Sequence, residues 1–413
     1  MLTEEQKKLI TIAKTGRNIF LSGGAGTGKS YVMQKLISEL RKEGKKVLVT
    51  APTGIAAIHV GGATLHRTFQ IPFGPCPELK GHIPKEILFA DVIIIDEISM
   101  CRADVFDYVA NVILRTEVKE KKTIQLIVCG DFCQLPPVVT NADAECLSSK
   151  YDGFYAFESA SWEMFDFVTI LLKDIIRQED KDFARMLNDI RIGKRAVVGE
   201  IYAHSNKNLI KDAITLYATN KKADERNLAE LHKLNAPITR FAATISGQVN
   251  KNEEPVPEEI QLAVGARVMF AINDSEERFA NGTFGIVTAV KAGFVKVKID
   301  DGPVVDVYPF EWTINKYTVK RVPNSAKEEI ITEKIGSFSQ IPLRLAYAIT
   351  MHKSQGQTYE KVNLDPYCFT EGQFYVALSR VKTIDNLHFL VPPKTEYLIT
   401  DLRVQDFYKN LAK

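Results

Sequence analysis

A glycine-rich loop near the start of the chain limits the folds that are open to it. The loop reads Gly23-Gly24-Ala25-Gly26-Thr27-Gly28-Lys29-Ser30, follows an apolar run and opens a helical stretch. It matches the pattern GxxxxGK[ST], in which backbone N–H groups close around phosphate oxygens. The lysine of this pattern reaches the β- and γ-phosphates, and the hydroxyl after it ligates Mg²⁺. We therefore predict a bound nucleoside triphosphate, with Lys29 and Ser30 in these two roles.

The residues around this loop indicate a parallel sheet. Short, continuous apolar runs alternate with helical stretches, which is typical of strands buried on both faces. The expected strands are 18–21, 47–50, 92–95, 124–129 and 167–172. The first domain is therefore predicted to be doubly wound α/β.

The pattern of predicted helices and strands changes twice in the second half of the chain. A helix at 182–192 and a strand at 213–218 continue the α/β pattern, which returns near residue 345. Between them, residues 266–331 alternate in short β-branched and aromatic runs broken by Asn-Gly, Ala-Gly and Asp-Gly. Such dipeptides mark tight turns. We expect the first domain to comprise residues 1–166. A second α/β domain would be formed by 167–261 and 336–413, and a small β-barrel or sandwich at 262–335 would interrupt it.

Composition excludes several classes of protein. The 413 residues include 53 Lys and Arg against 51 Asp and Glu, so bulk positive charge does not hold a nucleic acid. No apolar run is long enough to span a membrane, and the acidic N-terminus is unlike a signal or transit peptide. The six cysteines lack zinc spacing, and we interpret them as reduced, mostly buried thiols. We expect a cytoplasmic protein, associated with the nucleoid if it is bacterial.

Carboxylates and amides after later strands are candidates for the chemistry. Asp96 and Glu97 end the apolar run 92–95, and an acidic pair in that place is often only solvated. Downstream of a phosphate loop, the pair instead favours Asp96 in the Mg²⁺ shell and Glu97 as the base that polarises water. Gln134, which follows the next strand, either contacts the γ-phosphate and the water or belongs to a proline-terminated turn.

Gln6 has two interpretations. Thr3 and Gln6 have the spacing of a capping box, which would use the glutamine to close its own helix. The amide could instead bind adenine.

Taken together, the motifs resemble those of the petite-integration-frequency (Pif) helicases, which belong with RecD to superfamily 1B. The resemblance runs in order from about Leu2 to Leu390. Its motifs are 23–30, 51–57, 62–69, 96–100, 130–137, 176–178, 352–358 and 375–380.

The resemblance implies a fold and a set of further site residues. It implies two RecA-like P-loop NTPase domains, with a wedge insert near 70–84 in the first and an SH3-like β-barrel insert in the second. The wedge segment could also be a plain surface loop. Arg177 and Arg380 would be arginine fingers rather than surface ion pairs, and Gly356 would join the nucleotide site. The implied DNA contacts, each also explicable as a helix cap or satisfied polar group, are Thr53, Thr64, His66, Thr219, Asn220, His352, Lys353 and Ser354.

The same resemblance implies an activity and its partners. It implies an ATP- and Mg²⁺-dependent helicase that moves 5′ to 3′ on single-stranded DNA and unwinds forked duplex. G-quadruplexes and RNA–DNA hybrids are further expected substrates, with roles in DNA repair, recombination and telomere maintenance. We expect a monomer with no membrane partner. Two alternatives stay open: a RecD-like motor subunit of a nuclease or recombination complex, and an ATP-switched nucleic-acid clamp that does not unwind.

Overall fold

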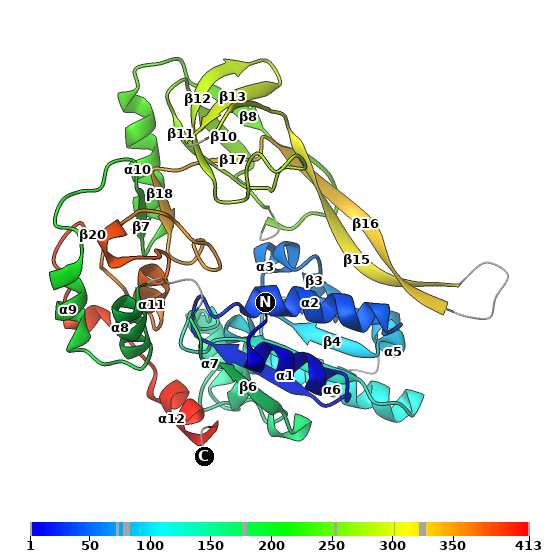
Figure 1. Cartoon of the computed structure of the whole chain (residues 1–413). Coiled ribbons are helices and arrows are strands. Elements are labelled where there is room, and N and C mark those ends of the chain that lie inside the picture. Colours follow the sequence, from blue (N-terminus) through cyan, green and yellow to red (C-terminus); the bar gives the residue numbers. More distant parts are fainter. Residues whose placement is uncertain are drawn as a thin grey trace. The chain divides into compact units, whose positions relative to one another are not determined.

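The structure is a computed structural model that describes residues 2–411, apart from 72–73, 77–82, 176–179, 252–253, 301 and 322–327. The chain divides into two compact units. Unit 1 contains residues 1–177, 315–335 and 402–413, and unit 2 contains residues 178–314 and 336–401. Figure 1 shows the order of the elements along the chain.

Unit 1 is built on a parallel sheet whose strands lie in the order β3-β2-β4-β5-β1-β6. The five strands expected from the apolar runs are all present, and a short sixth, β3, is added at the edge. The strands are β1 (Ile19–Gly23), β2 (Val47–Ala51), β3 (Ala63–Thr64), β4 (Val92–Ile95), β5 (Gln125–Gly130) and β6 (Val168–Leu172). This strand order brings the carboxyl ends of β1, β4 and β5 to one edge of the sheet.

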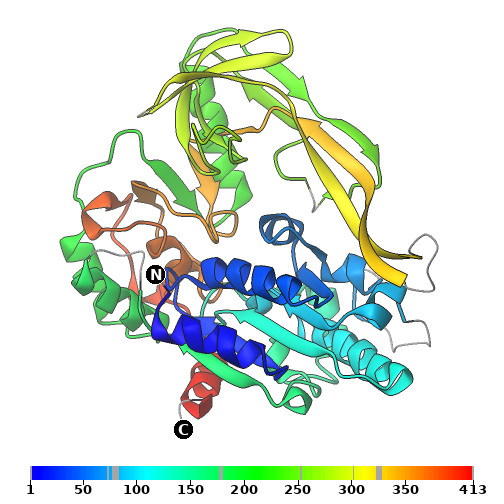
Figure 2. The same cartoon turned by 45° about the vertical axis from the view of Figure 1, so that its right-hand side comes forward.

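Helices cover both faces of the sheet, because alternate strand residues point to opposite sides. Ile19, Leu21 and their neighbours pack with α1 (Glu4–Ala13) and α2 (Lys29–Lys42), which lie on the same face (Figure 2). Phe20 and its neighbours pack with α6 (Ala103–Glu120) on the other. The shorter helices of unit 1 are α3 (Gly54–His59), α4 (Leu65–Thr68), α5 (Lys85–Phe89) and α7 (Asn141–Leu147).

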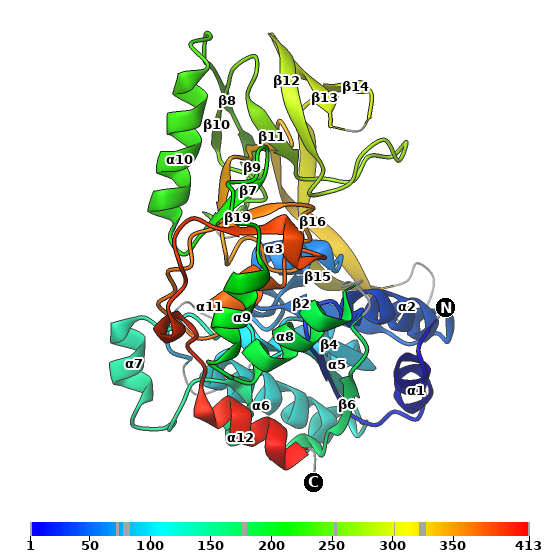
Figure 3. The same ribbon diagram turned by 60° about the vertical axis from the view of Figure 1, so that its left-hand side comes forward.

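The helix α12 (Leu402–Leu411) corrects the expected domain boundary. We expected residues 336–413 to complete the second α/β domain, but α12 belongs to unit 1. Phe407 stacks on Phe157 with ring centroids 4.3 Å apart, and Val404 is buried in the same cluster as residues of α6. Figure 3 shows α12 close to α6. This apolar face of α12 is matched by the aromatic cluster of unit 1, which gives the physical reason for the difference.

Unit 2 contains a smaller parallel sheet with strand order β18-β7-β19-β20. Its strands are β7 (Ile214–Tyr217), β18 (Ala348–Thr350), β19 (Val362–Leu364) and β20 (Leu387–Phe389). β7 matches the strand expected at 213–218, and β18 lies close to residue 345, where the α/β pattern was expected to return. The helices of this part are α8 (Lys181–Arg191), α9 (Val197–His204), α10 (Asn220–Lys233) and α11 (Gln373–Leu378). The α/β pattern therefore does return after a β-rich insertion.

The β-rich insertion extends beyond the expected 262–335 at both ends, and its residues 315–335 belong to unit 1 rather than to the second domain. It has a five-stranded antiparallel sheet in the order β14-β13-β12-β11-β17, a three-stranded sheet β15-β16-β9 and a pair β10-β8. The strands are β8 (Thr239–Ala242), β9 (Thr244–Gly247), β10 (Glu259–Leu262), β11 (Arg267–Phe270), β12 (Phe284–Lys291), β13 (Phe294–Ile299), β14 (Val304–Val307), β15 (Phe310–Arg321), β16 (Glu328–Gln340) and β17 (Leu343–Leu345). Short exposed strands such as β8 and β9 carry little alternation, which explains why the sequence boundary begins too late.

Candidate nucleotide site

The phosphate loop lies between β1 and α2, as its sequence predicts. Gly26 and Gly28 both have φ of +82°, in the left-handed region that favours glycine. Gly23 is required for a different reason: a Cβ there would lie 2.7 Å from the carbonyl oxygen of Leu172. The helix α2 begins at Lys29, so its free N–H groups point into the loop. This arrangement forms a cradle for an anion.

Lys29 reaches back over this loop. Its Nζ donates to the carbonyl oxygens of Gly23 at 2.9 Å and Gly24 at 3.0 Å. Thr27 Oγ1 also donates to the Gly24 carbonyl, at 2.9 Å. The loop is thus held closed by its own polar groups, with the ammonium group beside the backbone that would surround phosphate.

Gln6 closes its own helix and contacts the phosphate loop. Its Oε1 accepts from Thr3 N at 3.1 Å, and its own N–H donates to Thr3 Oγ1, which confirms the capping box. Its Nε2 donates to the carbonyl of Thr27 at 3.4 Å. The Gln6 side chain is buried. The same side-chain amide therefore caps helix α1 and links it to the phosphate loop. An adenine contact stays a prediction.

Asp96 and Glu97 follow β4, at the edge of the sheet that carries the loop. Asp96 is buried and its Oδ1 accepts from Glu97 N at 3.0 Å. Glu97 has φ of +50°, a left-handed conformation that is uncommon for a residue with a side chain. Such local strain persists where the surroundings enforce it, often at functional sites.

The segments of this site follow three neighbouring strands. β5 pairs in parallel with β1, where Ser22 lies opposite Gly130, and with β4, where Ile95 lies opposite Val128. The phosphate loop, the acidic pair and the turn after β5 therefore begin at the same edge of the sheet. Burial raises the pKa of the Cys129 thiol, near the end of β5, well above its usual range, and the charge of Asp96 raises it further.

Gln134 lies in a tight turn that follows β5. Its N–H donates to the carbonyl of Asp131 at 2.9 Å, and its Nε2 lies 3.5 Å from Asp131 Oδ2. Asp131 is fully buried and also accepts from Cys133 N at 3.2 Å. The two interpretations of Gln134 are compatible, because the turn presents its amide at the same sheet edge as the phosphate loop.

One residue beside this turn was not predicted from the sequence. The hydroxyl of Tyr408, on α12, contacts the Ser22 hydroxyl, the Phe132 N–H and the Asp131 carboxylate. A tyrosine on a short amphipathic helix far along the chain has no motif that would reveal this position. Only the tertiary structure places it here.

Of the two arginine candidates, the structure describes one. Arg177 lies outside the described residues. Arg380 belongs to unit 2 and is buried, donating to the carbonyls of Val376 at 2.7 Å, Ser354 at 3.0 Å and Gln357 at 3.0 Å. It therefore fastens α11 to the loop at 351–357 that includes Gly356, whose φ is +76°.

The expected DNA-contact residues divide between the two units. Thr53, Thr64 and Thr219 each cap a helix, accepting from Ala56 N, Arg67 N and Lys222 N respectively. Asn220 is exposed, and the Ser354 hydroxyl donates to the carbonyl of Met351 at 2.7 Å. The caps confirm the alternative interpretation for these threonines without testing a DNA contact.

The three basic candidates in that set are partly buried. Burial lowers the pKa of His66, His352 and Lys353 below the ordinary values. For both histidines, burial is the largest cause of the lowered pKa. Of the expected wedge at 70–84, residues 72–73 and 77–82 lie outside the described residues.

Other candidate sites are weaker within the part of the chain that the structure describes. Among the described residues, no cluster of three or more His, Cys, Asp or Glu side chains could hold a metal ion by itself. Within the same described ranges, no helix is long and apolar enough to cross a membrane. The six cysteines are free thiols, of which Cys101, Cys129 and Cys368 are buried.

A parallel sheet with a GxxxxGKS loop after β1 and an acidic pair after β4 defines a P-loop nucleoside triphosphatase. Residues 1–199 match the family described as PIF1-like helicase. The chain belongs to the Pif1 helicase family, with a parallel α/β core like that of solved Pif1 structures.

Individual relatives show how far the similarity extends. Over 95% of its length the chain is 31% identical to ATP-dependent DNA helicase Pif1 of Campylobacter jejuni, covering 94% of that protein. It is 32% identical over its whole length to human ATP-dependent DNA helicase PIF1, of which it spans 64%. The chain is also similar to the crystal structure of Bacteroides sp Pif1 in complex with ADP-AlF4, with 32% identity and a TM-score of 0.87. That alignment covers 100% of this chain and 97% of the Bacteroides chain. The chain thus spans less than two thirds of the human protein.

Proposed function

We propose that this protein is an ATP-dependent DNA helicase that moves 5′ to 3′ along single-stranded DNA and unwinds forked duplex. The observation that supports it most directly is the phosphate loop after β1 and the acidic pair after β4, which follow strands on either side of β5 at one edge of the parallel sheet. The alignment with a relative named ATP-dependent DNA helicase covers the whole length of this chain. Bacteroides Pif1, at 33% identity, has been crystallised bound to single-stranded DNA, with a TM-score of 0.71 to this chain and coverage of 99% and 97%.

Mg²⁺ fits the oxygen donors that this site offers. The cation usually binds through one or two protein oxygens, substrate phosphates and water, so Ser30 and Asp96 suffice without a dedicated cluster. When bound, Mg²⁺ would neutralise charge on the phosphates. Within the proposed reaction the backbone of 23–30 and Lys29 bind the phosphates, Glu97 accepts a proton from the attacking water, and Gln134 orients that water.

The test of direction uses two partial duplexes, each with one single-stranded tail. They differ only in whether that tail is a 5′ tail or a 3′ tail. We expect ATP-dependent strand displacement with a 5′ tail and little with a 3′ tail, because the motor would load on the tail and advance toward its 3′ end. Fluorescence of a labelled strand measures the displacement. Efficient displacement from the 3′ tail alone would contradict the proposed polarity, and none from either tail would favour the ATP-switched clamp.

Glu97→Gln is expected to bind ATP and DNA but to lower turnover by about 10² to 10³-fold, because the amide keeps the shape and loses the base. The variant should accumulate as a complex with ATP and DNA, measured by retention of labelled nucleotide. The matched control is Glu86→Gln, on α5 away from the loop. Wild-type turnover in Glu97→Gln would show that Glu97 is not the base.

The further substrates follow from the same proposal. A motor that follows the DNA backbone needs contacts to phosphates rather than to base edges. The side chains that could supply them by hydrogen bonds are the hydroxyls of Thr53 and Thr64 and the imidazoles of His66 and His352. Unwinding of G-quadruplexes and RNA–DNA hybrids, the monomeric state, and the arginine fingers Arg177 and Arg380 belong to the proposal. A RecD-like role as a motor subunit remains the second candidate, and sedimentation of the purified chain with DNA would reveal whether it acts alone.

A further inference from the structure

The hydroxyl of Tyr408 joins the ends of two neighbouring strands in unit 1. Strands β1 and β5 pair in parallel, with Ser22 opposite Gly130. The Tyr408 oxygen lies 2.7 Å from Ser22 Oγ, 3.1 Å from Phe132 N and 3.3 Å from Asp131 Oδ1. These three partners come from the residue before the phosphate loop and from the turn after β5.

The bonding capacity of a phenol determines the direction of each of these bonds. A phenolic hydroxyl has one proton to donate and two lone pairs to accept. Tyr408 donates its one proton to Asp131 Oδ1, and the Phe132 N–H donates to one lone pair of the Tyr408 oxygen. Ser22 then donates to the remaining lone pair. One phenolic oxygen therefore links all three groups.

This junction continues into the turn that carries Gln134. Asp131 Oδ1 also accepts from Cys133 N, and the Asp131 carbonyl accepts from Gln134 N at 2.9 Å. On the other side, Ser22 is directly followed by Gly23, the first residue of the phosphate loop. Tyr408 therefore lies between the two segments whose spacing sets the distance from Gln134 to a bound γ-phosphate.

Packing of α12 does not require this hydroxyl. Phe407 stacks on Phe157 and also meets Phe132 edge-on at 5.5 Å, while Val404 is buried among apolar neighbours. The Arg403 guanidinium pairs with Glu158 at 3.2 Å and anchors the start of the helix. The helix would keep its place without the phenolic oxygen, so that oxygen has a separable role.

We propose that Tyr408 is a positioning residue for ATP hydrolysis, which fixes the Asp131–Gln134 turn relative to the phosphate loop. This rests on the proposed function, in which Gln134 orients the attacking water. Polar groups fixed before the reaction spare the cost of reorganising them, and small displacements of such groups slow catalysis strongly. Tyr408 acts through Asp131 and touches no substrate itself.

The experiment compares Tyr408→Phe with Tyr151→Phe in the full chain. Tyr151 is a matched control, because its hydroxyl donates to the Asp107 carboxylate at 2.8 Å elsewhere in unit 1. For Tyr408→Phe we expect kcat of DNA-stimulated ATP hydrolysis to fall about tenfold to hundredfold, with KM for ATP within about twofold of wild type. Tyr151→Phe should keep wild-type kcat while both variants lose a similar few degrees of Tm. Wild-type kcat in Tyr408→Phe, or an equal loss in both variants, would overturn the inference.

Gln134→Ala and the double variant separate this inference from the proposed function. If Tyr408 acts through the turn, Gln134→Ala should lower kcat, and adding Tyr408→Phe should lower it by less than about twofold more. Full turnover in Gln134→Ala would refute the proposed role of Gln134 and this inference with it. A large loss in Gln134→Ala with an independent, multiplicative loss from Tyr408→Phe would leave the role of Gln134 intact and refute the positioning role of Tyr408.

Discussion

Lys29→Ala is expected to reduce ATP turnover by about 10³-fold or more, the largest effect of any single change in the phosphate loop. The Lys29 ammonium donates to the carbonyls of Gly23 and Gly24, and the proposed function has it bind the phosphates. DNA affinity without nucleotide should stay near wild type, because the expected DNA contacts lie in other loops. Turnover is measured by phosphate release, and binding by anisotropy of labelled single-stranded DNA.

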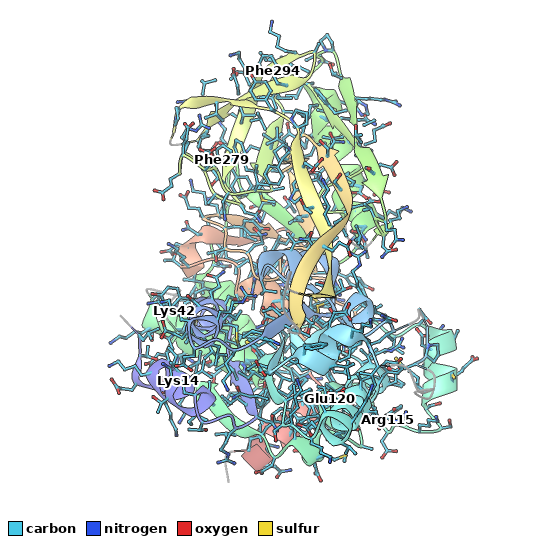
Figure 4. All side chains as sticks on the ribbon, turned by 90° about the vertical axis from the view of Figure 1, so that its right-hand side faces the viewer. Lys14, Lys42, Arg115, Glu120, Phe279 and Phe294 are labelled. Carbon is cyan, nitrogen blue, oxygen red and sulfur yellow. The ribbon has the colours of Figure 1, made fainter. Side chains whose placement is uncertain are left out.

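Lys42→Ala is the control for this change. Lys42 lies at the other end of the same helix, is exposed, and pairs with Glu39 at 3.1 Å (Figure 4). It should keep full turnover, since an exposed pair of this kind contributes little. Turnover by Lys29→Ala that matches the control would refute the assignment of the nucleotide site.

Arg380→Ala is expected to lower DNA-stimulated hydrolysis by about 10³-fold while ATP and DNA still bind. A guanidinium neutralises charge on the transferred phosphoryl group, and its supply from another domain makes hydrolysis depend on domain closure. The present hydrogen bonds of Arg380, to Ser354 and Gln357, lie within unit 2. To act as a finger the side chain must exchange at least one of them for the phosphate.

The same hydrogen bonds predict a second effect that has to be separated from the first. Buried carbonyls left without a donor cost about 1 to 3 kcal/mol each, so Arg380→Ala should also destabilise unit 2. Turnover is therefore compared well below the melting temperature, with Arg185→Ala, an exposed change on α8, as the control. Arg380→Lys should rescue poorly, because a point charge lacks the planar fork. Parallel losses of nucleotide binding, DNA binding and hydrolysis would show a purely structural role.

Local patterns predicted the nucleotide site because its chemistry resides in short, contiguous segments. The loop at 23–30 and the strand before Asp96 can each be recognised without knowledge of the remaining chain. Gln6 shows the limit, since the capping box was visible but its contact with Thr27, 21 residues away, was not. Arg380 was identified by its motif, while its two hydrogen bonds to the 351–357 loop depend on packing.

The boundaries of the units were less predictable for a related reason. An amphipathic helix has an apolar stripe that needs a partner, but its sequence does not specify which domain supplies that partner. Helix α12 follows the second α/β region along the chain and packs on the first. The β-rich insertion likewise begins with β8 and β9, whose mostly exposed residues resemble a loop.

The return of α12 to unit 1 also gives the first unit a late step in its synthesis. The ribosome makes β6, the last strand of the unit 1 sheet, and then residues 173–401 before it makes α12. Until α12 is made, Phe157 lacks its stacking partner Phe407, and Ser22 and Asp131 lack their hydrogen bonds to Tyr408. We therefore expect the incomplete chain to expose apolar surface that chaperones can bind, and unit 1 to complete its packing only after α12 has been translated.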